Sequence, residues 1–301
     1  MRILDKTDIE MITGKRINNG NAFKFIDGVS TPDRIKRNKI IFLEKADQKQ
    51  LKAINENCNI GELLIINKNL SGLVNGPNIV TLTPREDYSK IVSELFKYYK
   101  TYWTTENEGR SNKYQHRERQ GIFIHPSAKV SKNALIYPNV YIGPNCSVGS
   151  NTIIKSNTTI GQPGFGIIRK NNNEHIHLPH VGGVKIGKNV EIGAQNTIPA
   201  GTIYPTVIND FVKTDDQVHI GHNCIIGKGV ILTTNCKISG SVNIGAGSYF
   251  GPSVTINNGI RIGKKCFVGV GSVIIEDIED NRRVINLNRK FVTPEVDSTK
   301  D

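Results

Sequence analysis

A period of six residues organises the second half of the chain. An apolar side chain recurs at every sixth position over long runs, and glycine often follows it. The clearest pairs are Ile142-Gly143, Val148-Gly149, Ile160-Gly161, Ile186-Gly187, Ile192-Gly193, Ile220-Gly221, Ile226-Gly227, Ile244-Gly245, Phe250-Gly251, Ile262-Gly263 and Val268-Gly269. Neither an α-helix nor a flat strand requires this spacing, whereas a triangular coil with one short strand per face does. We expect the apolar residue to point inward and the glycine to relieve the backbone at the corner.

A column of mostly small residues runs in phase with the first, four positions after each apolar residue. Its members are Ala128, Ala134, Val140, Cys146, Thr152, Thr158, Val190, Val212, Val218, Cys224, Val230, Cys236, Val242, Ser248, Val254, Cys266 and Ser272. The interior of a triangular coil is narrow, so this column is expected to point inward as well. The two columns predict a mainly β fold, a parallel β-helix of hexapeptide repeats over residues 122–279.

Residues 1–103 lack the six-residue period. Apolar runs at 39–43, 63–66 and 78–81 predict strands, and residues 48–57 and 85–99 predict helices. These elements indicate a small N-terminal α/β domain. The polar residues 104–121 are interpreted as a linker, and residues 280–301 as a C-terminal tail.

Charge and hydropathy restrict the possible partners. The chain has 39 Lys and Arg against 27 Asp and Glu, a net charge of +12, which favours an anionic partner such as nucleotide phosphates or coenzyme A. The basic residues are scattered and no recognition helix is evident, so nucleic acid is not expected. No hydrophobic run could span a membrane and no secretory leader follows Met1, so we expect a cytoplasmic protein without an integral membrane segment.

The cysteines follow the repeat. Four of the five, Cys146, Cys224, Cys236 and Cys266, fall in the small inward column, and Cys58 lies outside it. We interpret the four as buried packing residues rather than disulfide or metal ligands.

The period breaks at two places. Residues 161–185 leave the register between Ile160 and Ile186, and a slip of four residues falls between Ile198 and Ile208. Loops that leave a regular scaffold in this way are usually functional.

The histidines supply candidate chemistry. His219 and His222 flank the inward Ile220, so both point outward, and an outward histidine can act as a general base at neutral pH. One turn of the coil is three hexapeptides, which places Gly240 about 4.8 Å from His222, one strand spacing away. A base beside a backbone N–H suits acyl transfer, because the amide stabilises the oxyanion. His116 and His125 are interpreted as surface residues.

Several stretches resemble the UDP-3-O-acylglucosamine N-acyltransferase (LpxD) family. They are Gly161-Gln-Pro-Gly-Phe-Gly166, Leu178-Pro-His-Val-Gly182, Val190-Glu-Ile-Gly-Ala-Gln-Asn-Thr-Ile198 and Asp216-Gln-Val-His-Ile-Gly-His-Asn223. The family shows G-x-x-G-F-G, I-P-Q-x-G, V-E-I-G-A-N-T-T-I and D-N-Q-V-Q-I-A-H-N in the same order. Ile41-Phe-Leu43 and Thr83-Pro-Arg85 are similar to its N-terminal I-S-F-L and N-P-R.

The resemblance implies a left-handed β-helix that forms a homotrimer with active sites between subunits. It implies that His222 is the catalytic base, that the Gly240 amide is the oxyanion donor and that Phe42 stacks on the nucleotide base. We also assign His219, Phe165 and Asn258 to substrate binding. No metal and no cofactor are expected, since the acyl thioester is a co-substrate.

The chain departs from the family in two respects. The family's second active-site histidine, in I-x-G-H, is replaced by Gly259, and its C-terminal helices that bind acyl carrier protein have little room here. Residues 269–281 instead resemble the ending of coenzyme A-dependent sugar acetyltransferases. We therefore predict an N-acyltransferase that transfers an acyl group from acyl-coenzyme A to a nucleotide-linked amino sugar for surface polysaccharide.

Three alternatives stay open. The first is a lipid A-pathway UDP-3-O-acylglucosamine N-acyltransferase that uses acyl carrier protein. The second is a γ-carbonic-anhydrase-like zinc enzyme, to which His175 and His180 would contribute ligands. The third is a non-catalytic β-helix scaffold.

Overall fold

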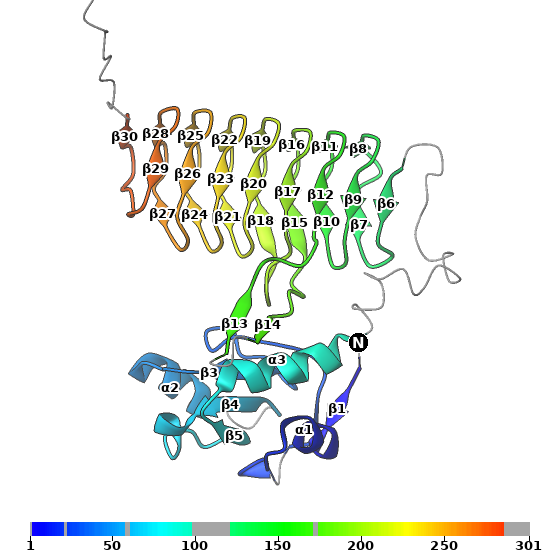
Figure 1. The fold of residues 1–301 in the computed structure, drawn as a ribbon, viewed down its shortest axis with the longest axis vertical. Helices are drawn as coiled ribbons and strands as arrows, with labels where there is room; N and C mark the ends of the chain where they lie inside the picture. The colour runs from blue at the N-terminus through cyan, green and yellow to red at the C-terminus, as the bar shows by residue number, and fades with distance from the viewer. Residues whose placement is uncertain (1, 21–22, 58–60, 98–120, 171–173, 286–301) are drawn as a thin grey trace, which may run out of the picture.

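The computed structural model describes residues 2–20, 23–57, 61–97, 121–170 and 174–285. Its two main parts are an N-terminal α/β domain and a long parallel coil, with a β-hairpin extending from the coil to the domain (Figure 1). Within the described ranges, no helix is long and apolar enough to cross a membrane.

The N-terminal domain has a three-stranded parallel sheet in the order β3-β4-β5. Its elements are β1 (Leu4–Asp5), α1 (Lys6–Thr13), β2 (Phe25–Ile26), β3 (Ile40–Leu43), α2 (Gln48–Glu56), β4 (Leu63–Asn67), η2 (Lys68–Leu70), β5 (Asn78–Thr81) and α3 (Pro84–Leu95). The sequence predicted the three strands and the helices α2 and α3. It did not predict α1, which begins at an Asp5 capping box and ends at Gly14 in the left-handed conformation.

The coil has three faces, each a parallel sheet. The first face contains β6 (Phe123–Ile124), β9 (Tyr141–Ile142), β12 (Thr159–Ile160), β17 (Thr197–Ile198), β20 (His219–Ile220), β23 (Lys237–Ile238), β26 (Thr255–Ile256) and β29 (Val273–Ile274). The second contains β7 (Lys129–Val130), β10 (Ser147–Val148), β15 (Val184–Ile186), β18 (Thr206–Ile208), β21 (Ile225–Ile226), β24 (Asn243–Ile244) and β27 (Arg261–Ile262). The third contains β8 (Leu135–Ile136), β11 (Ile153–Ile154), β16 (Glu191–Ile192), β19 (Lys213–Thr214), β22 (Ile231–Leu232), β25 (Tyr249–Phe250), β28 (Phe267–Val268) and β30 (Arg283–Val284).

This architecture confirms the predicted parallel β-helix. The first inward column forms a continuous core with the second, and Ile220, Cys224 and Val242 are fully buried within it. The four coil cysteines are free and buried, as expected for packing residues, whereas Cys58 lies outside the described residues. Strand β30 pairs with β28, so the coil continues to Val284, beyond the expected end at residue 279.

The corners differ from the prediction. The positive φ falls three residues after the inward apolar residue, as at Asn223 (φ 60°) and Ser241 (φ 60°), and not at the glycine that follows it directly. Glycine is required directly after the inward residue because neighbouring turns approach closely there. A β-carbon at Gly221 would lie 2.6 Å from the backbone nitrogen of Gly240 in the next turn. Gly161, where the chain leaves the coil, is an exception with φ 80°.

The two breaks in the period connect the coil to the N-terminal domain. The long excursion forms the antiparallel hairpin of β13 (Ile167–Arg169) and β14 (His175–His177). Leu178 and Val181 pack on the core of the domain, as does Ile203 from the four-residue slip. Next to Ile203, the Thr31 hydroxyl donates to the Tyr204 hydroxyl at 3.3 Å.

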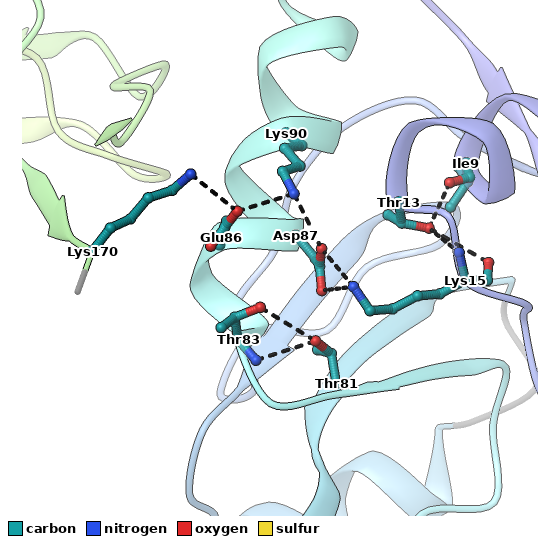
Figure 2. A network of polar contacts seen from close by, with 9 residues as sticks. All are labelled: Ile9, Thr13, Lys15, Thr81, Thr83, Glu86, Asp87, Lys90 and Lys170. Atoms are coloured by element: carbon teal, nitrogen blue, oxygen red, sulfur yellow. Dashed lines mark hydrogen bonds and ion pairs between the residues drawn. The ribbon is translucent and has the colours of Figure 1, made fainter. Parts of the chain in front are cut away.

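A chain of alternating charges adds to this attachment (Figure 2). Its ion pairs are Lys170–Glu86 at 3.5 Å, Lys90–Glu86 at 3.0 Å, Lys90–Asp87 at 3.8 Å and Lys15–Asp87 at 2.8 Å. Asp87 is fully buried on α3, so its pairing with Lys15 compensates the cost of burying the carboxylate. The hairpin is thereby joined to α3 at Glu86.

Candidate active site

His222 and Gly240 lie one above the other at the corner between the first and second faces. The register of β20 against β23 pairs His219 with Lys237, which places Gly240 directly above His222 in the next turn. The imidazole of His222 covers Gly240, since a β-carbon there would lie 2.7 Å from Cε1 and 2.8 Å from Nε2. The predicted juxtaposition is therefore present, and glycine at 240 makes room for the ring.

Gly240 is buried against the His222 ring, and its N–H group is unpaired: among the described residues no acceptor hydrogen-bonds to it, although its carbonyl oxygen accepts from Gly259 N–H at 3.0 Å. An unpaired N–H beside an imidazole is the donor that an oxyanion requires.

Asn258 occupies the next turn of the same corner, directly above Gly240. In the orientation that satisfies both ends of its amide, Nδ2 donates to the Gly240 carbonyl at 2.8 Å and Oδ1 accepts from Gly259 N–H at 3.3 Å. His222, Gly240 and Asn258 thus form one outward row.

Asn223 orients the His222 ring. Its Oδ1 accepts from the Thr202 N–H at 2.7 Å and the Thr202 hydroxyl at 3.1 Å, which leaves Nδ2 3.2 Å from His222 Nδ1. An amide nitrogen can only donate, so Nδ1 accepts and the neutral ring carries its hydrogen on Nε2. Partial burial lowers the pKa of His222 below its ordinary value, so the ring is neutral at pH 7.

His180 is a second histidine at this corner that the sequence did not single out for catalysis. Its ring centroid lies 5.0 Å from that of His222, with the planes at 68°. His180 is 8% exposed; its Nδ1 donates to the Leu178 carbonyl at 2.8 Å, and its buried Nε2 has no hydrogen-bond partner among the residues that the structure describes. Burial, and then the neighbouring His222, lower the pKa of His180 to about 4, so it too is neutral at pH 7.

Glycines of the excursion make space for His180. A β-carbon at Gly164 would lie 2.8 Å from His180 Nε2, and one at Gly166 would lie 2.8 Å from Cε1. Phe165 between them is 82% exposed, with its ring centroid 6.2 Å from that of His177. The structure thus places Phe165 beside the site, pointing to solvent.

The other predicted site residues lie further out. His219 is exposed on β20, three residues before His222. Phe42 lies on β3, half-buried, with the Tyr88 ring 4.8 Å away and the Arg85 guanidinium 6.0 Å from its centroid. It packs on the same N-terminal core as Leu178 and Val181, the residues that flank His180.

A cleft of about 680 Å³ separates the N-terminal domain from the hairpin. Its lining includes Leu82, Arg85 and Glu86 from the domain and Ile167–Lys170 from the hairpin. Arg85 pairs with Glu44 at 3.2 Å and Lys170 with Glu86, whereas Arg169 is exposed and makes no ion pair within the described ranges. This cleft therefore offers a free guanidinium next to an apolar wall.

The remaining histidines bear on two expectations from the sequence, the surface position of His116 and His125 and the zinc-enzyme alternative. His125 is buried, 4% exposed, with Nδ1 2.8 Å from Ser127 Oγ, so its interpretation as a surface residue was wrong. It closes the first turn of the coil, where it is packed by its neighbours; His116 lies outside the described residues. In the described part of the chain, no three His, Cys, Asp or Glu side chains group as a metal site would require.

Comparison with known proteins finds parts of the chain similar to hexapeptide-repeat transferases. A family model described as bacterial transferase hexapeptide (six repeats) matches residues 127–162. UDP-3-O-acylglucosamine N-acyltransferase 2 of Legionella pneumophila (strain Lens) is 45% identical over 86 residues, 29% of this chain and 25% of that protein. UDP-3-O-acylglucosamine N-acyltransferase of Helicobacter pylori (strain ATCC 700392 / 26695) is 42% identical over 92 residues, 31% and 27% of the two chains.

The match is partial in length. The chain spans about a quarter of the length of these curated relatives. Among solved structures, a Francisella novicida UDP-N-acetylglucosamine acyltransferase is 25% identical with a TM-score of 0.42, covering 52% of this chain and 62% of that one. The six-residue repeat and the parallel coil have hexapeptide-repeat architecture, and parts of the chain are similar to the bacterial transferase hexapeptide family and to the UDP-3-O-acylglucosamine N-acyltransferases.

Proposed function

We propose that the protein is an N-acyltransferase that acylates the amino group of a UDP-linked amino sugar. The observation that carries the proposal is the outward corner where the neutral imidazole of His222 lies against Gly240, whose N–H is open. A base and an oxyanion donor in one place are the two groups that transfer from a thioester requires. The chemistry needs no metal and no cofactor besides the acyl thioester.

The proposed reaction is an attack of the sugar amine on the thioester carbonyl carbon. A C–N bond forms, the amine gives a proton to Nε2 of His222, and the Gly240 N–H stabilises the oxyanion. The C–S bond then breaks and the protonated His222 returns the proton to the departing thiolate. The products are an amide and a thiol.

The contact with Asn223 sets a condition on this mechanism. With Nδ2 of Asn223 donating to Nδ1, the neutral His222 ring carries its hydrogen on Nε2. To accept a proton at Nε2 the ring must first move its hydrogen to Nδ1 and lose the Asn223 contact. We propose that this exchange of tautomer accompanies substrate binding.

The curated relatives favour one acceptor over the one predicted from the sequence. Both relatives reported above are named for UDP-3-O-acylglucosamine, which supports the lipid A-pathway alternative over a surface-polysaccharide sugar. We propose that the nucleotide occupies the cleft between the N-terminal domain and the hairpin, with its phosphates near Arg169 and its base near Phe42. His219, Phe165 and Asn258 would then surround the sugar and the acyl group.

A second candidate is a short-chain acyl-coenzyme A enzyme for another amino sugar. It is favoured by Gly259, which stands where the similar family has its second histidine, and by the ending at residues 269–281. The two candidates share the corner of His222 and Gly240 and differ in donor and acceptor.

The test is a matrix of donors and acceptors. Purified protein is incubated with UDP-glucosamine, its 3-O-acyl derivative and other nucleotide amino sugars, each with acyl-coenzyme A and with acyl carrier protein. Released thiol and the product mass are measured. Turnover of the 3-O-acyl derivative supports the first candidate, and turnover of another amino sugar with a short acyl-coenzyme A supports the second.

Two variants separate chemistry from folding. His222→Ala should lose about 10²–10⁴-fold in kcat, the usual cost of removing a general base. Lys213→Ala, on the third face, removes an exposed pair with Glu191 and should leave kcat unchanged. Absence of turnover with every pair, or a His222→Ala variant as active as the native protein, would contradict the proposal.

A further inference from the structure

The amide that corresponds to Gly240 is capped by a carboxylate at three other corners of the coil. The N–H groups of Lys188 and Ala194 donate to Oδ1 of Asp210 and Asp216 at 2.7 Å, and that of Lys264 donates to Oδ1 of Asp280 at 2.8 Å. In each case the aspartate lies directly above the amide in the next turn. The backbone N–H at the corner position of Gly240 can therefore bind an anionic oxygen, which at these three corners is a carboxylate of the chain itself.

Asn258 stands at the position of these aspartates relative to Gly240. The register pairs Lys237 with Thr255, which puts residue 258 directly above residue 240. Asn258 does not cap the amide below it, because its Nδ2 is turned to the Gly240 carbonyl at 2.8 Å. Within the described part of the chain, the N–H of Gly240 is left without an acceptor.

The residue before the amide differs as well. Gly187, Gly193 and Gly263 precede the three capped amides, and a β-carbon at Gly187 would collide with Oδ1 of Asp210. At the corner of Gly240 the corresponding residue is Ser239, which has a β-carbon. Ser239 thus carries a β-carbon at the position where, at Gly187, a β-carbon would collide with the capping carboxylate.

We propose that Ser239 and Asn258 are positioning residues that keep the Gly240 N–H open for the oxyanion. The inference rests on the proposed acyl transfer. Ser239 excludes a carboxylate from the amide, and Asn258 supplies at the capping position a side chain that binds the neighbouring carbonyl instead. The corner that holds His222 thus lacks the carboxylate cap that the other corners described above carry.

The experiment rebuilds the cap. In the double variant Ser239→Gly/Asn258→Asp, residues 239 and 258 match Gly187 and Asp210. The crystal structure of this variant should show the carboxylate of residue 258 hydrogen-bonded to Gly240 N–H. Its kcat, measured across the pH profile at the acceptor and donor that the native protein uses, should fall about 10²–10³-fold, the cost of losing one oxyanion donor, with KM little changed.

Two variants control for charge and packing. Asn257→Asp adds the same charge one residue away and should retain kcat. Asp210→Ala removes the carboxylate cap at another corner and should lower the Tm without changing kcat. A cap in the crystal structure with native kcat, a variant in which no cap forms, or an equal loss of kcat in Asn257→Asp would each overturn the inference.

The structural readout also separates this inference from the proposed function. If the native protein acylates no amino sugar, the proposed function fails. The crystal structure of the double variant still decides whether residues 239 and 258 control access to the amide.

Discussion

The Nε2 and Cε1 atoms of His222 lie only 2.8 Å and 2.7 Å from the position that a β-carbon on Gly240 would occupy. Gly240 has no positive φ, so alanine fits its backbone; its β-carbon would conflict most with the imidazole and would also lie 3.1 Å from the Asn258 side-chain amide. Gly240→Ala should therefore displace the His222 ring and lower kcat about 100-fold or more, since a misplacement of 1 Å can cost that much. Thermal unfolding should show an intact coil; native activity would contradict the contact.

Asn223 provides a test of the tautomer. Asn223→Asp keeps an acceptor for Thr202 and replaces the donor at His222 Nδ1 by a carboxylate. A carboxylate in contact raises a histidine pKa, by roughly one to three units, and stabilises the tautomer with Nδ1–H. The base is active when neutral, so the acidic limb of kcat/KM should move to higher pH by that amount. A limb that stays in place or moves to lower pH would refute the Asn223 contact.

His180 should make folding stability depend on pH. Its pKa of about 4 lies below the ordinary 6.5, so the unfolded chain binds this proton more readily than the native protein does. Stability from this group is complete above pH 6.5 and is lost as pH falls towards 4, by about 3 kcal/mol in all.

The variant His180→Gln carries the residue of the similar family and does not titrate. Urea unfolding at a series of pH values should show a flatter profile between pH 6.5 and 4 than the native protein shows. Identical slopes would mean that His180 is not buried as a neutral ring.

The inward cysteines should resist labelling. Burial raises the pKa of the Cys224 thiol to about 12 and that of Cys236 to about 11, so few thiolates exist at pH 8. Mass spectrometry after iodoacetamide treatment should find both unmodified in the native protein and modified in urea. Rapid labelling of either in the native state would contradict the register of the inward column.

The sequence predicted the coil well because each turn repeats the same physical constraint. The inward position of Ile220 and the outward position of His222 follow from counting, and so does the place of Gly240 one turn above. The corner backbone was assigned to the wrong residue, since the period identifies the inward side chain and not the later residue that takes positive φ, such as Asn223. The glycines that directly follow the inward residues mark the places where the backbones of neighbouring turns approach closely.

The sequence did not predict His180 as a neighbour of His222, because the excursion has no period from which to place it. One signal was present: His180 stands in Leu178-Pro-His-Val-Gly182, where the similar family has glutamine. The burial of His125 was missed for a similar reason, since it lies at the end of the coil, where the columns begin. The short helix α1 contains few apolar residues and gave no clear helical pattern.

The attachment of the N-terminal domain through the hairpin has a geometric consequence. The hairpin leaves the coil after β12, so the height of His222 above that point is a whole number of turns, each about 4.8 Å. An inserted turn of 18 residues after β16 would preserve both inward columns and every strand register, and the coil would still fold. It would nevertheless carry His222 away from His180 and from the cleft, so the length of the coil between the two is a property of the site.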